Sequence, residues 1–140
     1  MARRWGPALL SVACGAIIAA IKFGQGAPGG AAVLLSIFVV LAILTSPLAF
    51  PRGVPAAEAV AGGRPIVYWR PGCPYCLRLR ARLGPEASRL QWVDIWKDPE
   101  GAAVVRGFAD GNETVPTVVF GGEGFVNPDP QWVRERLQTL

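Results

Sequence analysis

Two long apolar stretches occupy the first third of the chain. The first runs from Trp5 to about Ile21 without a charged residue, and the second covers residues 31–50, again without a charge. About 20 apolar residues are enough for a helix to cross the hydrocarbon core of a bilayer. The glycine-rich residues 23–30 favour a tight turn between the two helices. The pattern therefore predicts a transmembrane hairpin over residues 1–50, with the lipid bilayer as a partner.

A cleaved signal peptide is the alternative interpretation of the first stretch, with Arg3 and Arg4 as its charged start. The second apolar stretch follows at once, which favours the hairpin. Residues 11–14 (SVAC) are a poor lipoprotein cleavage site, because serine stands where leucine is usual. We therefore expect Cys14 to be a small residue on a helix face.

The rest of the chain has the pattern of a small α/β domain. Residues 51–63 are rich in proline, alanine and glycine without periodicity, and predict a linker. Within residues 64–140, runs of β-branched and aromatic residues predict strands at 65–69, 90–96, 117–120 and 124–126. Helices are predicted at residues 74–83, from residue 99 until residues 110–112 (Asp-Gly-Asn) end the helix, and at residues 129–140. The order βαβαββα is a thioredoxin-like pattern.

Caps and apolar faces support these helices. Asp98 is expected to cap the second helix, with proline at its first position, and residues 127–128 (Asn-Pro) to cap the last. In the helix predicted at residues 74–83, Leu79 and Leu83 lie four residues apart, while Arg78 and Arg82 lie on another face. The other two apolar faces are expected to consist of Val104, Val105 and Phe108, and of Trp132, Val133 and Leu137.

Composition and charge separate the two parts of the chain. Hydrophobic residues make up 51% of the chain and charged residues only 17%, against an average near ~25% for soluble domains. Residues 1–50 hold three of the 14 basic residues and none of the 10 acidic ones. The second domain is therefore nearly neutral and has no lysine-rich face, which argues against nucleic acid as a partner.

The flanking charges predict an orientation in the membrane. Arg3 and Arg4 precede the first apolar stretch and Arg52 and Arg64 follow the second, whereas Lys22 alone lies near the turn. Because basic residues concentrate on the cytoplasmic side, we expect a multi-pass protein of the cell (inner) membrane. Both termini and the second domain would face the cytoplasm.

Residues 73–76 carry the candidate chemistry. Cys73, Pro74, Tyr75 and Cys76 follow a predicted strand and begin a predicted helix. The helix N-terminus stabilises a thiolate at Cys73, so we expect Cys73 to be the nucleophile and Cys76 the resolving thiol. The chain contains no histidine, which excludes Ser-His-Asp and Cys-His catalysis and His-ligated metals. A zinc half-site or a structural disulfide is the alternative, but zinc lacks two further ligands and we expect no metal.

A second motif lies about forty residues further on, at Thr114, Val115, Pro116 and Thr117. In thioredoxin-like folds the proline at this place forms a cis peptide bond and faces the cysteine pair. Such a bond would turn the backbone of Val115 outward, where its N–H and C=O can pair with an extended thiol substrate. The alternative is a trans proline that merely begins a strand.

With both motifs, residues 65–140 resemble the glutaredoxins, and most of all the mycoredoxins, the branch that uses mycothiol. The resemblance is carried by residues 73–80 (CPYCLRLR), 93–95 (VDI), 111–120 (GNETVPTVVF) and 126–128 (VNP). Glutathione-dependent members usually have a Gly-Gly turn and an acidic residue before the last helix. Residues 126–128 replace that turn here, so the resemblance implies mycothiol rather than glutathione as the reductant.

The resemblance also implies roles for single residues. Cys73 would attack a mixed disulfide between a protein substrate and a small thiol, and a second thiol molecule would regenerate it. Tyr75 would line the rim of the sulfur site, and Val115 and Asn127 would border the thiol groove. No bound cofactor is expected, because cluster-binding members have a single cysteine in a Cys-Gly-Phe-Ser motif. Exposed arginines such as Arg70, Arg78 and Arg106 are expected to be solvated.

Two further hypotheses remain open from the sequence. The protein is alternatively a membrane redox-sensing or assembly module that binds a partner membrane protein without turnover. A third variant places the second domain outside the cytoplasm, as an oxidant of exported proteins. Multiple turnover with an oxidised substrate would distinguish an enzyme from the sensing or assembly module. A topology reporter fused after Leu140 would show whether the second domain lies outside the cytoplasm.

Overall fold

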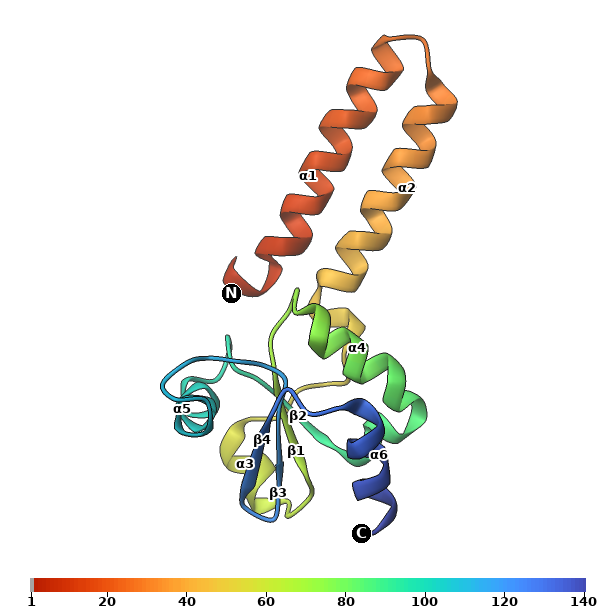
Figure 1. Ribbon diagram of the computed structural model, residues 1–140. Helices are drawn as coiled ribbons and strands as arrows, with labels where there is room; N and C mark the ends of the chain where they lie inside the picture. Colours follow the sequence, from red (N-terminus) through yellow and green to blue (C-terminus); the bar gives the residue numbers. More distant parts are fainter. Residues whose placement is uncertain (1) are drawn as a thin grey trace. The chain divides into compact units, whose positions relative to one another are not determined.

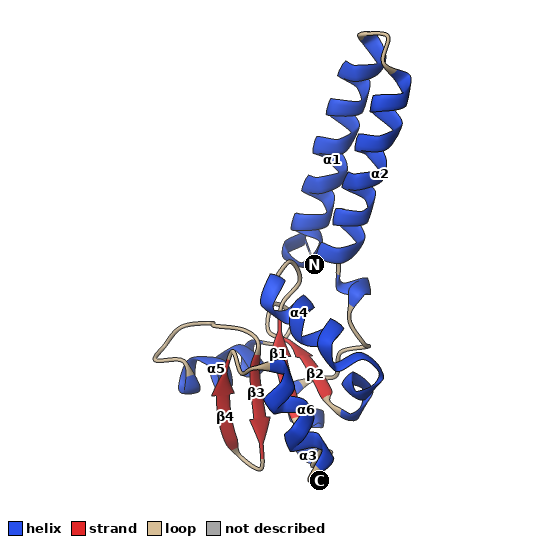
Figure 2. Cartoon of the chain, turned by 45° about the vertical axis from the view of Figure 1, so that its right-hand side comes forward, coloured by secondary structure: helices blue, strands red, loops and turns tan. Residues whose placement is uncertain are grey.

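The computed structural model describes residues 2–140, with the backbone alone for residues 2–4 and 47 (Figure 1). It consists of two compact units, one that ends at Ala49 and one that runs from Phe50 to Leu140. The first unit is a helical hairpin and the second contains all the strands (Figure 2).

The first unit consists of helix α1 (Ala2–Gly24), helix α2 (Pro28–Thr45) and a short 3-10 turn η1 (Pro47–Ala49). The helices pack closely at Gly15, where an added Cβ would overlap the Phe38 side chain. Residues 5–24 and 28–45 are long and apolar enough to cross a membrane, and most of their large apolar side chains are exposed.

The ends of the hairpin helices differ from the prediction. The turn covers only residues 25–27, because both helices extend into the glycine-rich segment. Helix α2 ends at Thr45 instead of continuing to residue 50. Ser46 is extended, with φ −84° and ψ 160°, as expected for a residue that precedes a proline.

The second unit is built on a mixed four-stranded sheet in the order β2-β1-β3-β4. Its strands are β1 (Ile66–Trp69), β2 (Gln91–Asp94), β3 (Thr117–Phe120) and β4 (Glu123–Val126). β1 and β2 are parallel, whereas β3 runs antiparallel to both β1 and β4. This sheet and its helices confirm the predicted α/β thioredoxin-like fold.

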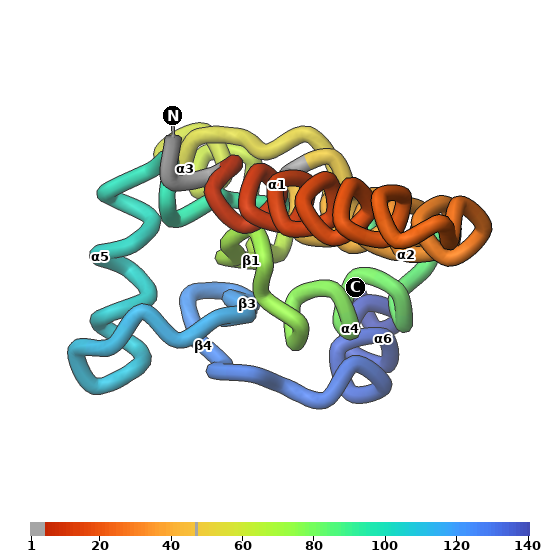
Figure 3. The backbone as a smooth tube through the Cα atoms, turned by 90° about the horizontal axis from the view of Figure 1, so that it is seen from above, coloured from red at the N-terminus to blue at the C-terminus, as the bar shows by residue number. Residues whose placement is uncertain are grey.

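Helices cover both faces of the sheet (Figure 3). Helices α4 (Pro74–Leu83) and α6 (Pro130–Gln138) lie side by side on one face, and α5 (Pro99–Phe108) lies on the other. Each of the three begins with proline, preceded by a cap whose side chain accepts a backbone N–H: Cys73, Asp98 and Asp129. The predicted cap at Asn127 is therefore wrong, because the carboxylate of Asp129 accepts the N–H groups of Gln131 and Trp132.

The core lies between the sheet and the two helix layers. Its fully buried side chains come from the strands and from the predicted helix faces, and include Val67, Val93, Val118, Leu79, Leu83, Val105, Val133 and Leu137. Phe108 was expected to face inward but is 38% exposed. It lies over Gly124, where an added Cβ would overlap its ring.

The predicted linker at residues 51–63 is wrong, because this segment folds onto the second unit. It contains helix α3 (Ala56–Ala61), on the same face of the sheet as α5. The Ala56 N–H donates to the Asp98 carboxylate at 2.6 Å, and the Val54 N–H donates to the Trp92 carbonyl of edge strand β2 at 3.0 Å. Phe50, expected at the end of the hairpin, stacks on Trp69 with ring centroids 3.9 Å apart.

Strand β2 is shorter than predicted. It ends at Asp94, whose carboxylate accepts the N–H of Trp96 and whose carbonyl accepts the N–H of Lys97 and Asp98. The Ile95 N–H still donates to the Trp69 carbonyl of β1 at 3.0 Å, and the turn that follows leads directly into α5. Residues 84–89 form a 3-10 turn, η2 (Gly84–Arg89), between α4 and β2.

Candidate active site

The two cysteines lie where β1 passes into α4. Strand β1 ends at Trp69, and Gly72 adopts φ 77°, a conformation that costs glycine little. Cys73 then takes the cap position of α4 and Pro74 the first helical position. The sheet thus fixes the start of the loop and the helix fixes its end, which holds Cys73 at the positive end of α4.

Three groups surround the Cys73 sulfur. The Cys76 N–H donates to it at 3.2 Å, and the Cys76 thiol lies 2.6 Å from it. On the other side the Cys73 thiol reaches the Val115 carbonyl at 3.4 Å. Both cysteines are in the free form, Cys76 fully buried and Cys73 5% exposed.

The two thiols differ in acidity. The pKa of Cys73 is lowered to about 7, chiefly by the hydrogen bond from the Cys76 thiol. Burial opposes this, while the N–H groups of Cys76 and Tyr75 and the charge of Arg70 lower the pKa further. The pKa of Cys76 is raised, first by burial and then by its hydrogen bond to Cys73 and the negative charge there. Cys73 is therefore the thiolate and Cys76 the proton donor.

Arg70 is held near the thiols by an aromatic ring. Its guanidinium carbon lies 5.8 Å from the centroid of the Trp96 ring, within the range of a cation–π contact. The sequence singles out Arg70, but nothing in it indicates Trp96, which reaches this place through the turn after β2. By contrast, Arg106 pairs with Glu113 at 2.8 Å.

The second motif lies beside the first, because β1, which leads to the cysteines, is paired with β3, which begins at Thr117. The Val115–Pro116 bond is cis, as the thioredoxin-like pattern implies. Val115 is buried, and its carbonyl faces the Cys73 thiol. Thr114 is exposed, and its carbonyl accepts the Thr117 hydroxyl at 2.8 Å. The Asn127 N–H donates to the Pro116 carbonyl at 2.7 Å. Thus the chain segments at 73–76, 114–117 and 127 converge.

A small depression opens beside this cluster. It has a volume of about 170 Å³ and is lined by Tyr75, Arg78, Leu79 and residues 127–130. Tyr75 is 55% exposed, and Asn127 adopts φ 47°, a left-handed conformation that asparagine tolerates. The predicted rim residues Tyr75 and Asn127 therefore share one depression, to which Arg78 also belongs.

The donor set around the cysteines suits thiol chemistry. Within residues 2–140, no group of three or more histidine, cysteine, aspartate or glutamate side chains lies together as metal ligands would. The lowered pKa of Cys73 supplies the thiolate that attacks a disulfide, and the second thiol of Cys76 lies within reach of the same sulfur.

Comparisons with known proteins agree with this geometry. The glutaredoxin family profile matches residues 66–126. Two Mycobacterium tuberculosis proteins, from strains CDC 1551 and H37Rv and both named as glutaredoxins, are 36% identical over 75 residues, which is 53% of this chain and 89% of theirs. Glutaredoxin-C2 of Arabidopsis thaliana is 30% identical over 69 residues, 48% of this chain and 62% of its own. The chain therefore belongs to the glutaredoxin family of thiol–disulfide oxidoreductases.

Proposed function

We propose that this protein is a membrane-anchored, cytoplasm-facing oxidoreductase that reduces mixed disulfides between proteins and mycothiol. The observation that carries the proposal is the position of Cys73. It caps α4, accepts two hydrogen bonds from Cys76, and has a pKa lowered to about 7. Half of it is therefore thiolate near neutral pH, and the thiolate is the reactive form.

In the first step the Cys73 thiolate attacks the mycothiol sulfur of the mixed disulfide. The bond between the two substrate sulfurs breaks, and a new disulfide joins Cys73 to mycothiol. The protein sulfur leaves as a thiolate with the electron pair of the broken bond and takes a proton, so the free protein thiol is restored while Cys73 carries the disulfide. The main chain at Val115 and the Tyr75 rim would hold the small thiol for this attack.

A second mycothiol molecule closes the cycle. Its thiolate attacks the mycothiol sulfur attached to Cys73, which releases mycothiol disulfide and restores the Cys73 thiolate. Mycothiol is thus a co-substrate, and the protein needs no bound cofactor in this cycle.

Cys76 offers a second route. Its thiolate would attack the Cys73 sulfur, release mycothiol and leave a disulfide between the two cysteines, which a further thiol reductant must then reduce. Two of the causes that raise the Cys76 pKa, the hydrogen bond to Cys73 and the charge there, disappear once Cys73 is in a mixed disulfide. Cys76 therefore becomes more acidic at the step where it would act.

The choice of mycothiol rests on residues 126–128. The sequence Val-Asn-Pro stands where glutathione-dependent members typically have a Gly-Gly turn, while an acidic residue before the last helix is retained as Asp129. The Asn127 N–H binds the Pro116 carbonyl, so residue 127 lies beside the cis-proline motif where the small thiol would dock.

Membrane attachment rests on the hairpin. Helices α1 and α2 are long and apolar enough to cross a bilayer. Four arginines flank the two ends of the hairpin, whereas a single lysine, Lys22, lies near its turn. The positive-inside rule then favours a cytoplasmic position for the second unit. A reporter active only after export, fused after Leu140, should stay silent, and a strong signal would contradict this orientation.

The test of the function compares two cysteine variants on one protein carrying a mycothiol mixed disulfide. Cys73→Ser should abolish turnover, since the remaining thiol of the pair, Cys76, is fully buried. Cys76→Ser should keep part of it, because a hydroxyl can still donate to Cys73 and mycothiol can regenerate the enzyme.

Equal activity of the two variants would contradict the roles. A single turnover without regeneration would favour a redox-sensing module instead. A matched substrate with glutathione in place of mycothiol tests the thiol, and an equal or higher rate with glutathione would overturn the choice of mycothiol.

A further inference from the structure

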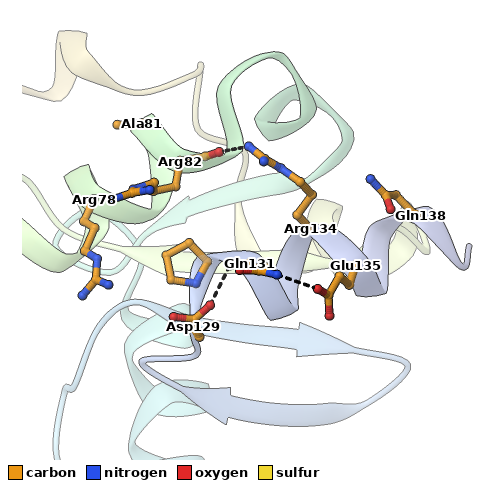
Figure 4. A pocket seen from close by; sticks show the side chains of 9 residues that line it. Arg78, Ala81, Arg82, Asp129, Gln131, Arg134, Glu135 and Gln138 are labelled. Atoms are coloured by element: carbon orange, nitrogen blue, oxygen red, sulfur yellow. Dashed lines mark hydrogen bonds between the residues drawn. The ribbon is translucent and has the colours of Figure 1, made fainter.

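A second, larger depression adjoins the small one beside Tyr75. It lies between α4 and α6 and has a volume of about 570 Å³ (Figure 4). We call it the α4–α6 groove; its walls are Arg78 and Arg82 from α4, and Gln131, Arg134, Glu135 and Gln138 from α6. It shares Arg78 and residues 129–130 with the small depression. The two depressions therefore adjoin at these residues, and the smaller one reaches Tyr75 of the active-site motif.

The helix periodicity explains why this hollow is polar. Leu79 and Leu83 of α4 are buried, as are Val133 and Leu137 of α6. Arg78 and Arg82 lie one turn apart beside the first pair, and Gln131 and Gln138 lie two turns apart beside the second. The apolar faces pack and leave the polar faces as the two walls of the groove.

Some side chains in the walls are already fixed. Arg134 binds Glu86 at 3.0 Å and also donates to the Arg82 carbonyl, which ties α6 to α4. The Gln131 amide donates to Glu135 at 3.0 Å. Figure 4 shows the hydrogen bond from Arg134 to Arg82 and the one from Gln131 to Glu135. The groove is therefore held in shape by its own hydrogen bonds.

Other side chains in the walls remain available. Arg78, Arg82 and Gln138 form no hydrogen bond or ion pair with any other side chain within residues 2–140. A guanidinium offers donors only, whereas an amide offers both a donor and an acceptor. A ligand in the groove would thus meet free hydrogen-bonding groups at both ends.

The charges in the walls are mixed. Arg134 is neutralised by Glu86, and the carboxylates of Asp129 and Glu135 line the same hollow as Arg78 and Arg82. A strongly anionic ligand would face these carboxylates, whereas hydroxyl groups can donate to them and accept from the arginines. The exposed Tyr75 ring at the entrance adds a flat surface for a sugar ring. The lining therefore suits a neutral, hydroxyl-rich group.

The spacing of the lining residues along the two helices indicates how large a group the groove could hold. Arg78 and Arg82 are about 6 Å apart along the helix, and Gln131 and Gln138 are about 10 Å apart. This is room for two six-membered rings laid end to end. Mycothiol carries such a group, since its N-acetylcysteine is joined to glucosamine and inositol.

We propose that the α4–α6 groove binds the sugar portion of the small thiol, and that Arg82 and Gln138 determine specificity for it. The inference rests on the proposed function for the identity of the thiol, and adds a site beyond the cysteine motif. The sulfur would lie at Cys73, and the glucosamine and inositol rings would pass Tyr75 into the groove.

The test measures equilibrium binding of S-methyl mycothiol to the full-length protein in detergent by calorimetry. This thioether cannot exchange with Cys73, so the measurement is independent of turnover. The double variant Arg82→Ala/Gln138→Ala should bind it about tenfold more weakly, as expected for two lost hydrogen bonds. Arg89→Ala, which removes an exposed arginine of η2 outside the groove, is the matched control and should leave the affinity unchanged.

S-methyl N-acetylcysteine, which lacks both rings, should bind the wild type and the double variant equally. An unchanged affinity of the double variant for S-methyl mycothiol would overturn the proposal. So would an equal loss for both probes, because the groove would then act on the cysteine portion. Both variant sites are exposed, and an unchanged thermal unfolding midpoint confirms that the variant is folded.

The two proposals fail in different ways. If S-methyl mycothiol binds and the double variant weakens it, the groove assignment stands even where turnover of mycothiol mixed disulfides fails. If turnover is efficient but S-methyl mycothiol binds no better than S-methyl N-acetylcysteine, the groove assignment is wrong and the oxidoreductase function stands.

Discussion

At the scale of single residues, Cys73 takes a position that other helices of the domain give to a carboxylate. Asp98 caps α5 and Asp129 caps α6, each followed by proline. Cys73 caps α4 in the same way, and its sulfur accepts the Cys76 N–H. A capping position stabilises negative charge, so the hydrogen bond that begins the helix also lowers the pKa of the nucleophile.

The pH dependence of Cys73 alkylation tests this arrangement. The pKa of Cys73 is about 7, so its reaction with iodoacetamide should be slow in acid and rise to half its maximum near pH 7. Arg70→Gln removes a positive charge that lowers this pKa, which moves the midpoint to higher pH and reduces the rate at pH 7. Tandem mass spectrometry identifies the alkylated sulfur, because fragment ions that break the chain between residues 73 and 76 separate Cys73 from Cys76 in their shared peptide.

Arg89→Gln is the control for charge, since Arg89 is exposed on η2 and is not among the groups that shift the Cys73 pKa. Its midpoint should equal that of the wild type. A midpoint unchanged by Arg70→Gln would show that the α4 terminus and Cys76 alone set the acidity of Cys73.

At the scale of elements, α5 owes its close packing on the sheet to one glycine. Gly101 is buried on the face toward the sheet, and an added Cβ would lie 2.8 Å from a Val93 methyl carbon and 3.4 Å from the Tyr68 ring. Gly107 lies on the same helix, with nothing within 4 Å of an added Cβ. The same residue type thus has a packing role at one position and none at the other.

Alanine substitutions on α5 should have opposite effects. Gly107→Ala should stabilise the protein by about 0.5–1 kcal/mol through helix propensity. Gly101→Ala gains the same propensity but overpacks the helix–sheet contact, which costs about 1–3 kcal/mol, so it should be the less stable of the two. Urea unfolding of the chain of residues 50–140 measures both, and equal stabilisation by the two substitutions would refute the packing role.

At the scale of the whole molecule, the second unit is larger than the region matched by the family profile. The profile begins at residue 66, but Phe50 stacks on Trp69, the Val54 N–H binds edge strand β2, and α3 is tied to Asp98. The segment that leads from the hairpin therefore also covers a sheet edge, which would otherwise expose unpaired backbone groups.

Removing residues 50–63, or their contacts with the sheet, should destabilise the second unit. Phe50→Ala in the chain of residues 50–140 should cost about 3 kcal/mol, because Phe50 is buried and fills a stack against a core tryptophan. Val60→Ala, on the exposed face of α3, should change stability by less than about 0.5 kcal/mol. A chain of residues 64–140 as stable as that of residues 50–140 would show the segment to be a linker after all.

Much of the fold follows from local patterns. Asp98 as a cap followed by proline predicted where α5 begins, and the spacing of Leu79 and Leu83 predicted the buried face of α4. The β-branched residues 117–120 gave β3. The spacing of Cys73 and Cys76 at a strand-to-helix junction predicted the candidate site. Each of these signals acts within one or two turns of chain, where sequence and conformation are directly linked.

What the sequence alone determined is therefore the two-part organisation, the α/β order and the cysteine chemistry. Only the tertiary structure decided that residues 51–63 fold onto the sheet, that Trp96 holds Arg70, and that Asp129 rather than Asn127 caps α6. The α4–α6 groove also depends on it, because its walls come from helices about fifty residues apart. The physical reason is common to all of them: these features depend on contacts between segments distant along the chain, and no local periodicity specifies such partners.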